Sequence, residues 1–157
     1  MPWHEILRAR EMWLGNQPSD VQWPDCGIAI EGDFAGIQQY VLKPVPGAKG
    51  AAKRLRGRSL QVSALTELIA NKTCETFEDA KVFYSAGGRF LISAAAIGGW
   101  GDRLRELQKL LDDWIGTQFR GEVVFHLAGA EFSDGQIPRK ALGAELQRRK
   151  NRSLGTC

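Results

Sequence analysis

The chain has 157 residues, which is typical of one domain, and its 43% hydrophobic and 25% charged residues are ordinary for a soluble globular protein. Its net charge of +3 is too small to define a partner, and its three cysteines have neither metal-binding nor paired spacing. No apolar run approaches the ~20 residues of a membrane-spanning helix, and no signal-peptide core is present. We therefore expect a cytoplasmic protein with reduced thiols and no membrane partner.

The first segment of the chain is expected to be a short amphipathic helix over residues 2–14, followed by a linker. The later segments show strand alternation or helical stripes, separated by glycine and proline. The predicted elements are a strand over 26–31, a helix from 33 to about 41, a helix over 59–71, strands over 81–86 and 89–95, a helix over 102–119, a strand over 122–128 and a basic helix over 140–149.

The order of these elements indicates the fold. Apart from the helix at 59–71 it reads βαββαβ, the split βαβ pattern of a ferredoxin-like fold. We expect an α+β domain of this fold over residues 23–133, with an antiparallel sheet and helices on one face. The N-terminal helix and linker (1–22) precede this domain, and a basic C-terminal helix or tail (134–157) follows it.

The segment from residue 43 to 59 is the most unusual in charge. It holds six basic residues, and no acidic residue occurs between Asp33 and Glu67. Guanidinium groups suit phosphate oxygens, and glycines in the segment let a backbone approach a ligand closely. We predict a phosphate-binding loop that precedes a helix capped by Ser59, with a solvated charge run as the alternative. The candidate phosphate, RNA or assembly contacts are Lys49, Lys53, Arg54, Arg56 and Arg58.

Asp33 stands at the end of the first strand, where nucleotide-polymerising palms often hold a metal-binding carboxylate. Two-metal phosphoryl transfer needs several oxygen ligands around the ions. The tight turn at Gly87 and Gly88 is followed by Arg89, which cannot bind a cation. We therefore predict no metal site and no catalytic residue in this chain, with a helix N-cap as the other interpretation of Asp33. His126, alone on the last strand, is predicted to be structural.

Three sequence strings carry a resemblance to a known family. They are D-F-A-G-I-Q at 33–38, K-G-A-A-K-R-L-R-G-R-S at 49–59 and Y-S-A-G-G-R-F at 84–90. In this order and spacing they resemble the first palm domain of the large polymerase-like subunit of type III CRISPR effector complexes, over about residues 27–128. Two features depart from that family: Ala35 stands where a serine is frequent, and no G-G-D-D string occurs. The short N-terminal segment leaves no room for the family's nuclease domain, which suggests a split subunit, a short form or an excised piece.

The resemblance implies a function that needs a second palm. In this family two facing palms bind two ATP molecules, and the G-G-D-D palm holds Mg²⁺ or Mn²⁺ and makes cyclic oligoadenylates when target RNA is bound. This chain would then help to bind ATP and scaffold the complex, without being a catalyst alone. Its partners would be other effector subunits, the guide RNA and the target RNA. The implied nucleotide-binding residues are Asp33, Ala35, Gly36, Ile37, Gly87 and Gly88.

Two alternatives belong to other functional classes. One is a purely structural assembly subunit that has lost nucleotide binding, which Ala35 and the missing carboxylates favour. The other is a stand-alone RNA-binding module of ferredoxin-like fold, which needs exposed aromatic side chains on the sheet for base stacking. Phe83, Phe90 and Phe125 are the candidates for that role, although alternation along the strands places some of them in the core.

Overall fold

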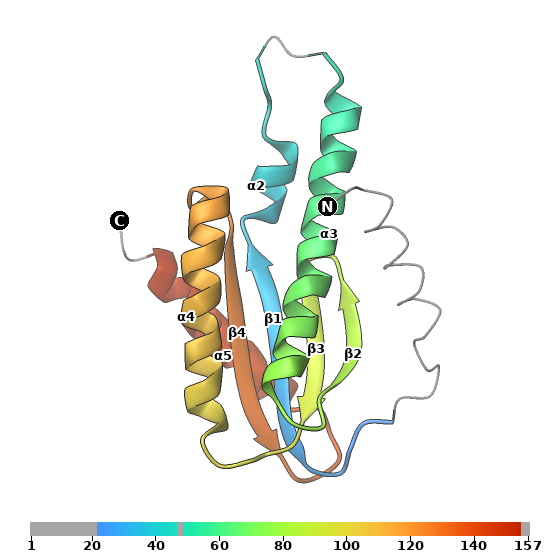
Figure 1. The fold of residues 1–157 in the computed structure, drawn as a ribbon, viewed down its shortest axis with the longest axis vertical. Helices are drawn as coiled ribbons and strands as arrows, with labels where there is room; N and C mark the ends of the chain where they lie inside the picture. Colours follow the sequence, from blue (N-terminus) through green and yellow to red (C-terminus); the bar gives the residue numbers. More distant parts are fainter. Residues whose placement is uncertain (1–21, 47–48, 155–157) are drawn as a thin grey trace.

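The structure, a computed structural model, describes residues 22–46 and 49–154, so the helix expected at 2–14 lies outside the described residues. Its centre is an antiparallel four-stranded sheet with the order β2-β3-β1-β4 (Figure 1). This arrangement confirms the predicted α+β ferredoxin-like palm fold. The elements are β1 (Gly27–Ala35), α2 (Ile37–Leu42), α3 (Ala51–Thr76), β2 (Lys81–Ala86), β3 (Arg89–Ala94), α4 (Trp100–Phe119), β4 (Val124–Phe132) and α5 (Arg139–Leu154).

One face of the sheet packs against α3 and α4 (Figure 1). Side chains alternate between the two faces of a strand, so Ile28, Ile30 and Phe34 of β1 all point into this layer. There they join Phe90 and Phe125, whose rings lie 5.7 Å apart between centroids. Each buried side chain of this size contributes roughly 1.5–3 kcal/mol. This layer is the main core of the domain.

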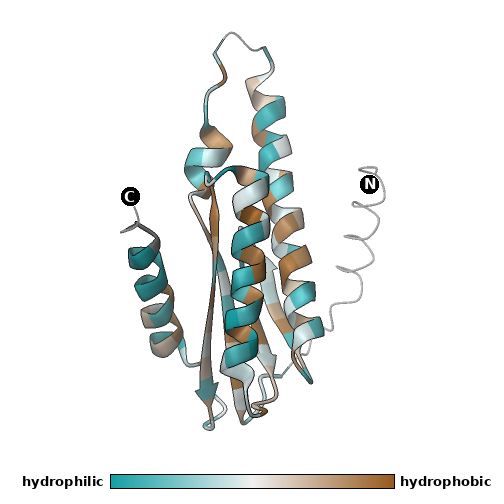
Figure 2. Cartoon of the chain, turned by 60° about the vertical axis from the view of Figure 1, so that its left-hand side comes forward, coloured by the Kyte–Doolittle hydropathy of each residue, from teal (hydrophilic) through white to brown (hydrophobic). Residues whose placement is uncertain are grey.

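The second face of the sheet is covered by α5, which lies on the side opposite α3 and α4 (Figure 2). Leu142 and Leu146 are spaced i, i+4 on α5 and pack against Ala29, Ala128 and Phe132. The segment after residue 134 was predicted as a basic helix or tail outside the palm. A helix does form there, and its two buried leucines pack it onto the sheet as part of a second hydrophobic layer.

From Ala51 onward the basic segment is a helix and not the predicted loop. Helix α3 begins at Ala51, directly after Gly50, whose backbone is left-handed with φ of 85°. Ser59 therefore lies inside α3 and caps nothing. The physical reason is composition: alanine, lysine, arginine and leucine are strong helix formers, and a single glycine at position 57 weakens but does not end the helix. The end of α2 and the start of α3 project beyond the sheet (Figure 1).

Asp33 also differs from its predicted place as a helix N-cap. Strand β1 continues through Ala35, and Asp33 pairs with Arg89 on one side and His126 on the other in the strand register. Gly36, with φ of 84°, then turns the chain into α2. Across residues 22–46 and 49–154, none of the helices combines the length and apolar character needed to cross a membrane.

Candidate functional site

The junction of β1 with α2 meets the β2–β3 hairpin at one end of the sheet. The backbone N–H of Phe34 donates to the carbonyl of Gly88 over 2.9 Å. Gly88 is buried with φ of 85°, and a Cβ atom there would overlap the side chain of Ile37. This position thus requires glycine on two grounds, backbone conformation and space. We call this end of the sheet, residues 33–37 and 87–88, the palm edge; it contains all six residues predicted to contact nucleotide.

The carboxylate of Asp33 is paired with two cations at the palm edge. Arg89 Nε lies 3.3 Å from Asp33 Oδ1, and Lys150 of α5 forms an ion pair with Oδ2. The Asp33 side chain is only 10% exposed, so both contacts lie in a partly desolvated setting. The hydrogen bond from Arg89 to Asp33 raises the pKa of the Arg89 guanidinium. A second carboxylate, Glu31, lies 3.7 Å from Arg89 Nε.

This set of donors does not fit a divalent cation. The one buried acid at the palm edge, Asp33, already has two cationic partners. Within residues 22–46 and 49–154, no three or more His, Cys, Asp or Glu side chains gather closely enough to hold a metal ion. Two-metal chemistry therefore has no ligand shell in the part of the chain that the structure describes.

Two of the predicted phosphate contacts, Arg54 and Arg58, donate hydrogen bonds to backbone carbonyls of the same region. Arg58 donates to the carbonyl oxygens of Tyr40, at 3.0 Å, and Lys43, at 2.7 Å. Its guanidinium also lies 5.5 Å from the centroid of the Tyr40 ring. Because these carbonyls belong to the last turn of α2 and to its C-cap residue, Arg58 ties the end of that helix to α3. Arg54 donates to the carbonyl of Lys49 in the same region.

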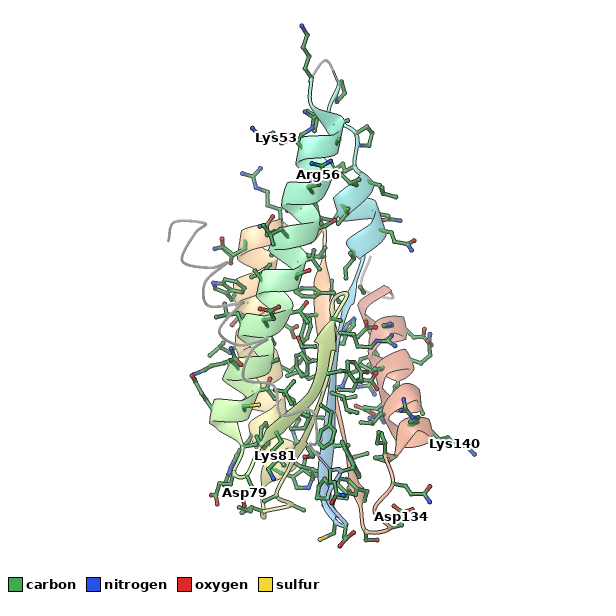
Figure 3. All side chains as sticks on the ribbon, turned by 90° about the vertical axis from the view of Figure 1, so that its right-hand side faces the viewer. Lys53, Arg56, Asp79, Lys81, Asp134 and Lys140 are labelled. Atoms are coloured by element: carbon green, nitrogen blue, oxygen red, sulfur yellow. The ribbon has the colours of Figure 1, made fainter. Side chains whose placement is uncertain are left out.

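The other basic candidates lie on the projection formed by residues 42–46 and 49–58, which we call the strut. Lys49, Lys53 and Arg56 are exposed there, and Figure 3 shows Lys53 and Arg56 well beyond the sheet. Leu42 and Leu55 on the strut are 68% and 40% exposed. The strut therefore presents apolar and basic groups together, at a distance from the hydrophobic layers.

The aromatic side chains that base stacking would need are not available on the sheet. Phe90 and Phe125 are 0% and 1% exposed because they point into the layer under α3 and α4. Phe83 is half-buried, with its ring 4.6 Å from that of Trp23. Phe90 and Phe125 are therefore the candidates that strand alternation places in the core, and α5 covers the other face of the sheet.

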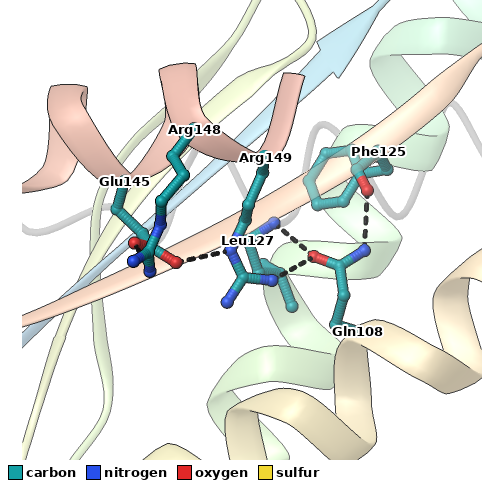
Figure 4. A network of polar contacts seen from close by, with 6 residues as sticks. All are labelled: Gln108, Phe125, Leu127, Glu145, Arg148 and Arg149. Carbon is teal, nitrogen blue, oxygen red and sulfur yellow. Dashed lines mark hydrogen bonds and ion pairs between the residues drawn. The ribbon is translucent and has the colours of Figure 1, made fainter. Parts of the chain in front are cut away.

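Three functional-site neighbours were missed by sequence reasoning or given a smaller role. Lys150 contacts Asp33 although the two residues are 117 positions apart in sequence, and no local sequence pattern predicts such a pair. Gln108 of α4 bonds to the backbone of β4 and to Arg149 of α5 (Figure 4). His126, predicted to be structural, is 5% exposed, and its Nε2 has no hydrogen-bond partner.

Burial of His126 predicts a pH-dependent stability. Desolvation lowers the pKa of His126 below its ordinary 6.5, opposed mainly by Asp112. Below pH 6.5 His126 is therefore protonated in the unfolded chain but still neutral in the folded chain. The free energy of unfolding falls as the pH is lowered from 6.5 to the pKa of His126 in the folded state. Urea unfolding at several pH values should show this loss in the wild type and a flatter dependence in His126→Gln. Equal slopes for the two proteins would contradict the assignment.

The fold and the palm edge define a ferredoxin-like palm domain in which the Asp33 carboxylate is ion-paired with two basic side chains. Residues 28–154 match the protein-family model described as Csm1 subunit domain B. Since the match spans more than half of the chain, the chain belongs to this family. The resemblance to the large subunit of type III CRISPR complexes is thereby confirmed.

Two curated relatives are described as CRISPR system single-strand-specific deoxyribonucleases Cas10/Csm1 of subtype III-A. The Thermococcus onnurineus protein is 30% identical over 134 residues, which cover 81% of this chain and 17% of that protein. The Methanocaldococcus jannaschii protein is 28% identical over 101 residues, covering 63% of this chain and 12% of that protein. The chain therefore spans less than a fifth of the length of these relatives.

Solved structures share the fold. The crystal structure of Csm1 from T. onnurineus has a TM-score of 0.67 at 23% identity, covering 82% of this chain and 20% of that one. A crystal structure of an apo Csm1–Csm4 cassette has a TM-score of 0.68 at 22% identity, covering 92% of this chain and 22% of that one. These likenesses extend over most of the chain and support a single architecture for the domain.

Proposed function

We propose that this domain is the first palm of a two-palm ATP site in a type III CRISPR effector complex. The observation that carries the proposal is the palm edge, where the β1–α2 junction and a glycine hairpin abut through the Phe34–Gly88 hydrogen bond. Gly87 is exposed there with φ of 62°, and nothing lies within 4 Å of its missing Cβ. A nucleotide can therefore approach the backbone closely at this turn.

The proposal divides the work between two palms. This palm supplies a surface for the nucleotide, with Asp33 paired to Arg89 and Lys150, and a second G-G-D-D palm supplies the carboxylates that hold Mg²⁺ or Mn²⁺. When bound, these ions would stabilise negative charge on the transferring phosphoryl group. Csm1–Csm4 cassettes of similar fold are described in complex with AMPPNP, with one ATP and with cA4, which supports a nucleotide ligand.

The strut is proposed to serve assembly or to meet phosphate. Lys49, Lys53 and Arg56 lack nearby acidic residues in sequence, and Leu42 and Leu55 add apolar surface. Such a mixture suits a protein partner with an acidic rim, and the Csm1–Csm4 structures suggest a Csm4-like subunit. Guide RNA and target RNA would reach the domain through that complex.

A second candidate is a structural subunit without nucleotide binding. Ala35 has no hydroxyl group that could contact a phosphate, and the Asp33 carboxylate is already ion-paired with Lys150. Both observations are compatible with a palm that only positions its neighbours. The two candidates differ in whether ATP binds.

Titration calorimetry with ATP tests the proposal. We expect heat of binding when the chain is combined with the G-G-D-D palm of the same complex, and about tenfold weaker binding for Gly87→Asn, a change of roughly 1.4 kcal/mol. Asparagine adopts a left-handed backbone more readily than most residues, so the variant adds bulk at the turn with less strain than another side chain would. The Arg56→Ala variant reports separately on the strut.

The control for this titration is Gly99→Asn. Gly99 is left-handed too, with φ of 80° and nothing within 4 Å, but it precedes α4 far from the palm edge along the chain. It should leave ATP binding unchanged. If ATP gives no heat of binding either with or without the second palm, the ATP site is rejected and the structural candidate is favoured.

A further inference from the structure

A groove runs between α4 and α5, with the outer edge of β4 as its floor. Its volume is about 660 Å³, within the range of ~300–1,000 Å³ that small-molecule sites occupy. None of the palm-edge residues lines it. The groove is therefore a separate feature of the domain, and a ligand could occupy it whether or not ATP binds at the palm edge.

Arginines project from both walls of this groove. Arg105 comes from α4, and Arg148, Arg149 and Arg152 come from α5, whereas the acidic residues among the described lining residues are Asp112 and Glu145. At the exposed rim, Arg105 is ion-paired with Asp102 and Arg148 with Glu145. The planar guanidinium group binds phosphate oxygens through paired hydrogen bonds. The walls thus carry an excess of positive charge in the form that phosphate recognition prefers.

One of these arginines is held in place by the protein. Glu145 accepts from Arg149 Nε over 2.9 Å, and Gln108 Oε1 accepts from Nη1 over 3.4 Å (Figure 4). A guanidinium has five N–H donors, so these two bonds leave others for a ligand. Because its position is fixed beforehand, less conformational entropy is lost when a ligand binds.

The floor of the groove contains a buried polar atom without a partner. His126 lines the groove, its side chain is 5% exposed, and its Nε2 makes no hydrogen bond. Buried polar atoms nearly always have partners, so an orphan calls for a reason. A ligand oxygen in the groove would supply the missing contact. The charged groups that act on His126 are Asp112 of α4, Asp33 of β1, and Arg149 and Lys150 of α5.

We propose that the α4–α5 groove binds a phosphate group of a nucleotide-sized ligand. Arg105 and Arg148 close on the phosphate from opposite walls, Arg149 supplies donors in a fixed orientation, and His126 Nε2 contacts a ligand oxygen from the floor. The phosphate belongs either to a free nucleotide or to the backbone of a single-stranded RNA. No bond is made or broken, so this is a binding site.

The test follows the His126 ring by NMR while ligand is added to the whole chain. The chain has two histidines, so His126→Gln assigns the signal. The probes are inorganic phosphate, adenosine monophosphate and a short oligouridylate RNA. We expect the bound anion to raise the pKa of His126 and to shift its ring signals saturably. Tightest binding by the mononucleotide identifies a free nucleotide, and tightest, strongly salt-dependent binding by RNA identifies the backbone.

The variants separate the groove from general positive charge. The double variant Arg105→Ala with Arg148→Ala should weaken binding about tenfold or more, since charge-assisted hydrogen bonds are lost. The matched control, Lys109→Ala with Arg139→Ala, also removes one cation from each helix, but outside the groove lining. It should change affinity less than about twofold. A silent His126 signal with all three probes, or an equal loss in both double variants, would overturn the proposal.

Discussion

Replacing Gln108 with leucine is expected to lower the free energy of unfolding by about 2–4 kcal/mol. Gln108 is 8% exposed, and β4 is an edge strand of the sheet. The Gln108 side chain makes hydrogen bonds to the β4 backbone of the kind that a neighbouring strand would make. Its amide donates to the carbonyl of Phe125 over 2.8 Å, and its oxygen accepts from the N–H of Leu127 over 2.7 Å. Leucine fits the space but leaves both backbone groups buried without partners.

Urea unfolding of Gln108→Leu measures this loss, and hydrogen exchange at Leu127 localises it. Gln118→Leu is the matched control because Gln118 is exposed on the same helix. It should lie within about 0.5 kcal/mol of the wild type. A Gln108→Leu variant as stable as the control would mean that water replaces the side chain at the edge of β4. The same variant also removes one contact of Arg149, so it should loosen the α4–α5 groove.

The sheet was predictable from sequence because its signals are local. The apolar run of β2, the two glycines at 87 and 88 and the return strand β3 specify a hairpin without help from elsewhere in the chain. Helix α4 was equally clear, since Leu104, Leu107 and Leu111 recur at helical spacing and are all buried. From these elements the split βαβ order, and with it the ferredoxin-like fold, followed directly.

The start of α3 was predicted wrongly, as a loop, because the prediction rested on the charge of the segment and not on its helix propensity. Charged residues indicate which side chains face water, whereas the alanine- and leucine-rich sequence from Ala51 onward predicts a helical backbone. The consequence for the site is specific. In a loop all the basic groups could converge on one ligand, but on α3 Arg58 turns inward to the α2 carbonyls while Lys53 and Arg56 stay on the exposed strut.

Whether the Asp33 carboxylate is ion-paired could not be predicted from sequence. The string around Asp33 indicates a palm, but whether its carboxylate is open to a metal depends on Lys150, which arrives with α5 from 117 residues away. The docking of α5 depends in turn on Leu142 and Leu146, two apolar residues in an otherwise polar segment. Tertiary packing of a weakly amphipathic helix therefore decides the chemistry of the palm edge.

This arrangement gives the proposed division between two palms a physical basis. A buried carboxylate with two cationic partners is stabilised in place, and a divalent ion would have to displace Lys150 or Arg89 to reach it. The palm edge can still offer backbone groups, because Gly87 stays exposed beside the Phe34–Gly88 hydrogen bond. We infer that such a palm is suited to holding a nucleotide for a neighbour and unsuited to activating it.

Introducing a side chain at Gly32 is expected to destabilise the domain more than any surface change. Gly32 lies in the middle of β1, and an added Cβ would meet ring carbons of Phe125 and of Phe90 at 2.5 Å. Both rings are almost fully buried and packed against each other, so neither has room to withdraw. Gly32→Ala should cost about 1–3 kcal/mol and Gly32→Val more, measured by urea or thermal unfolding.

A second substitution separates packing from strand propensity. If the two rings cause the loss, Phe90→Leu should recover part of it when combined with Gly32→Ala, because the two residues share one space. Gly57→Ala is the matched control: its Cβ meets nothing within 4 Å on the exposed side of α3, and alanine should stabilise that helix by about 0.5–1 kcal/mol. Opposite signs for the two glycine-to-alanine changes are the expected result. An unchanged Gly32→Ala, or a double variant no better than the sum of its parts, would show that the rings move aside and that β1 tolerates a side chain beside Asp33.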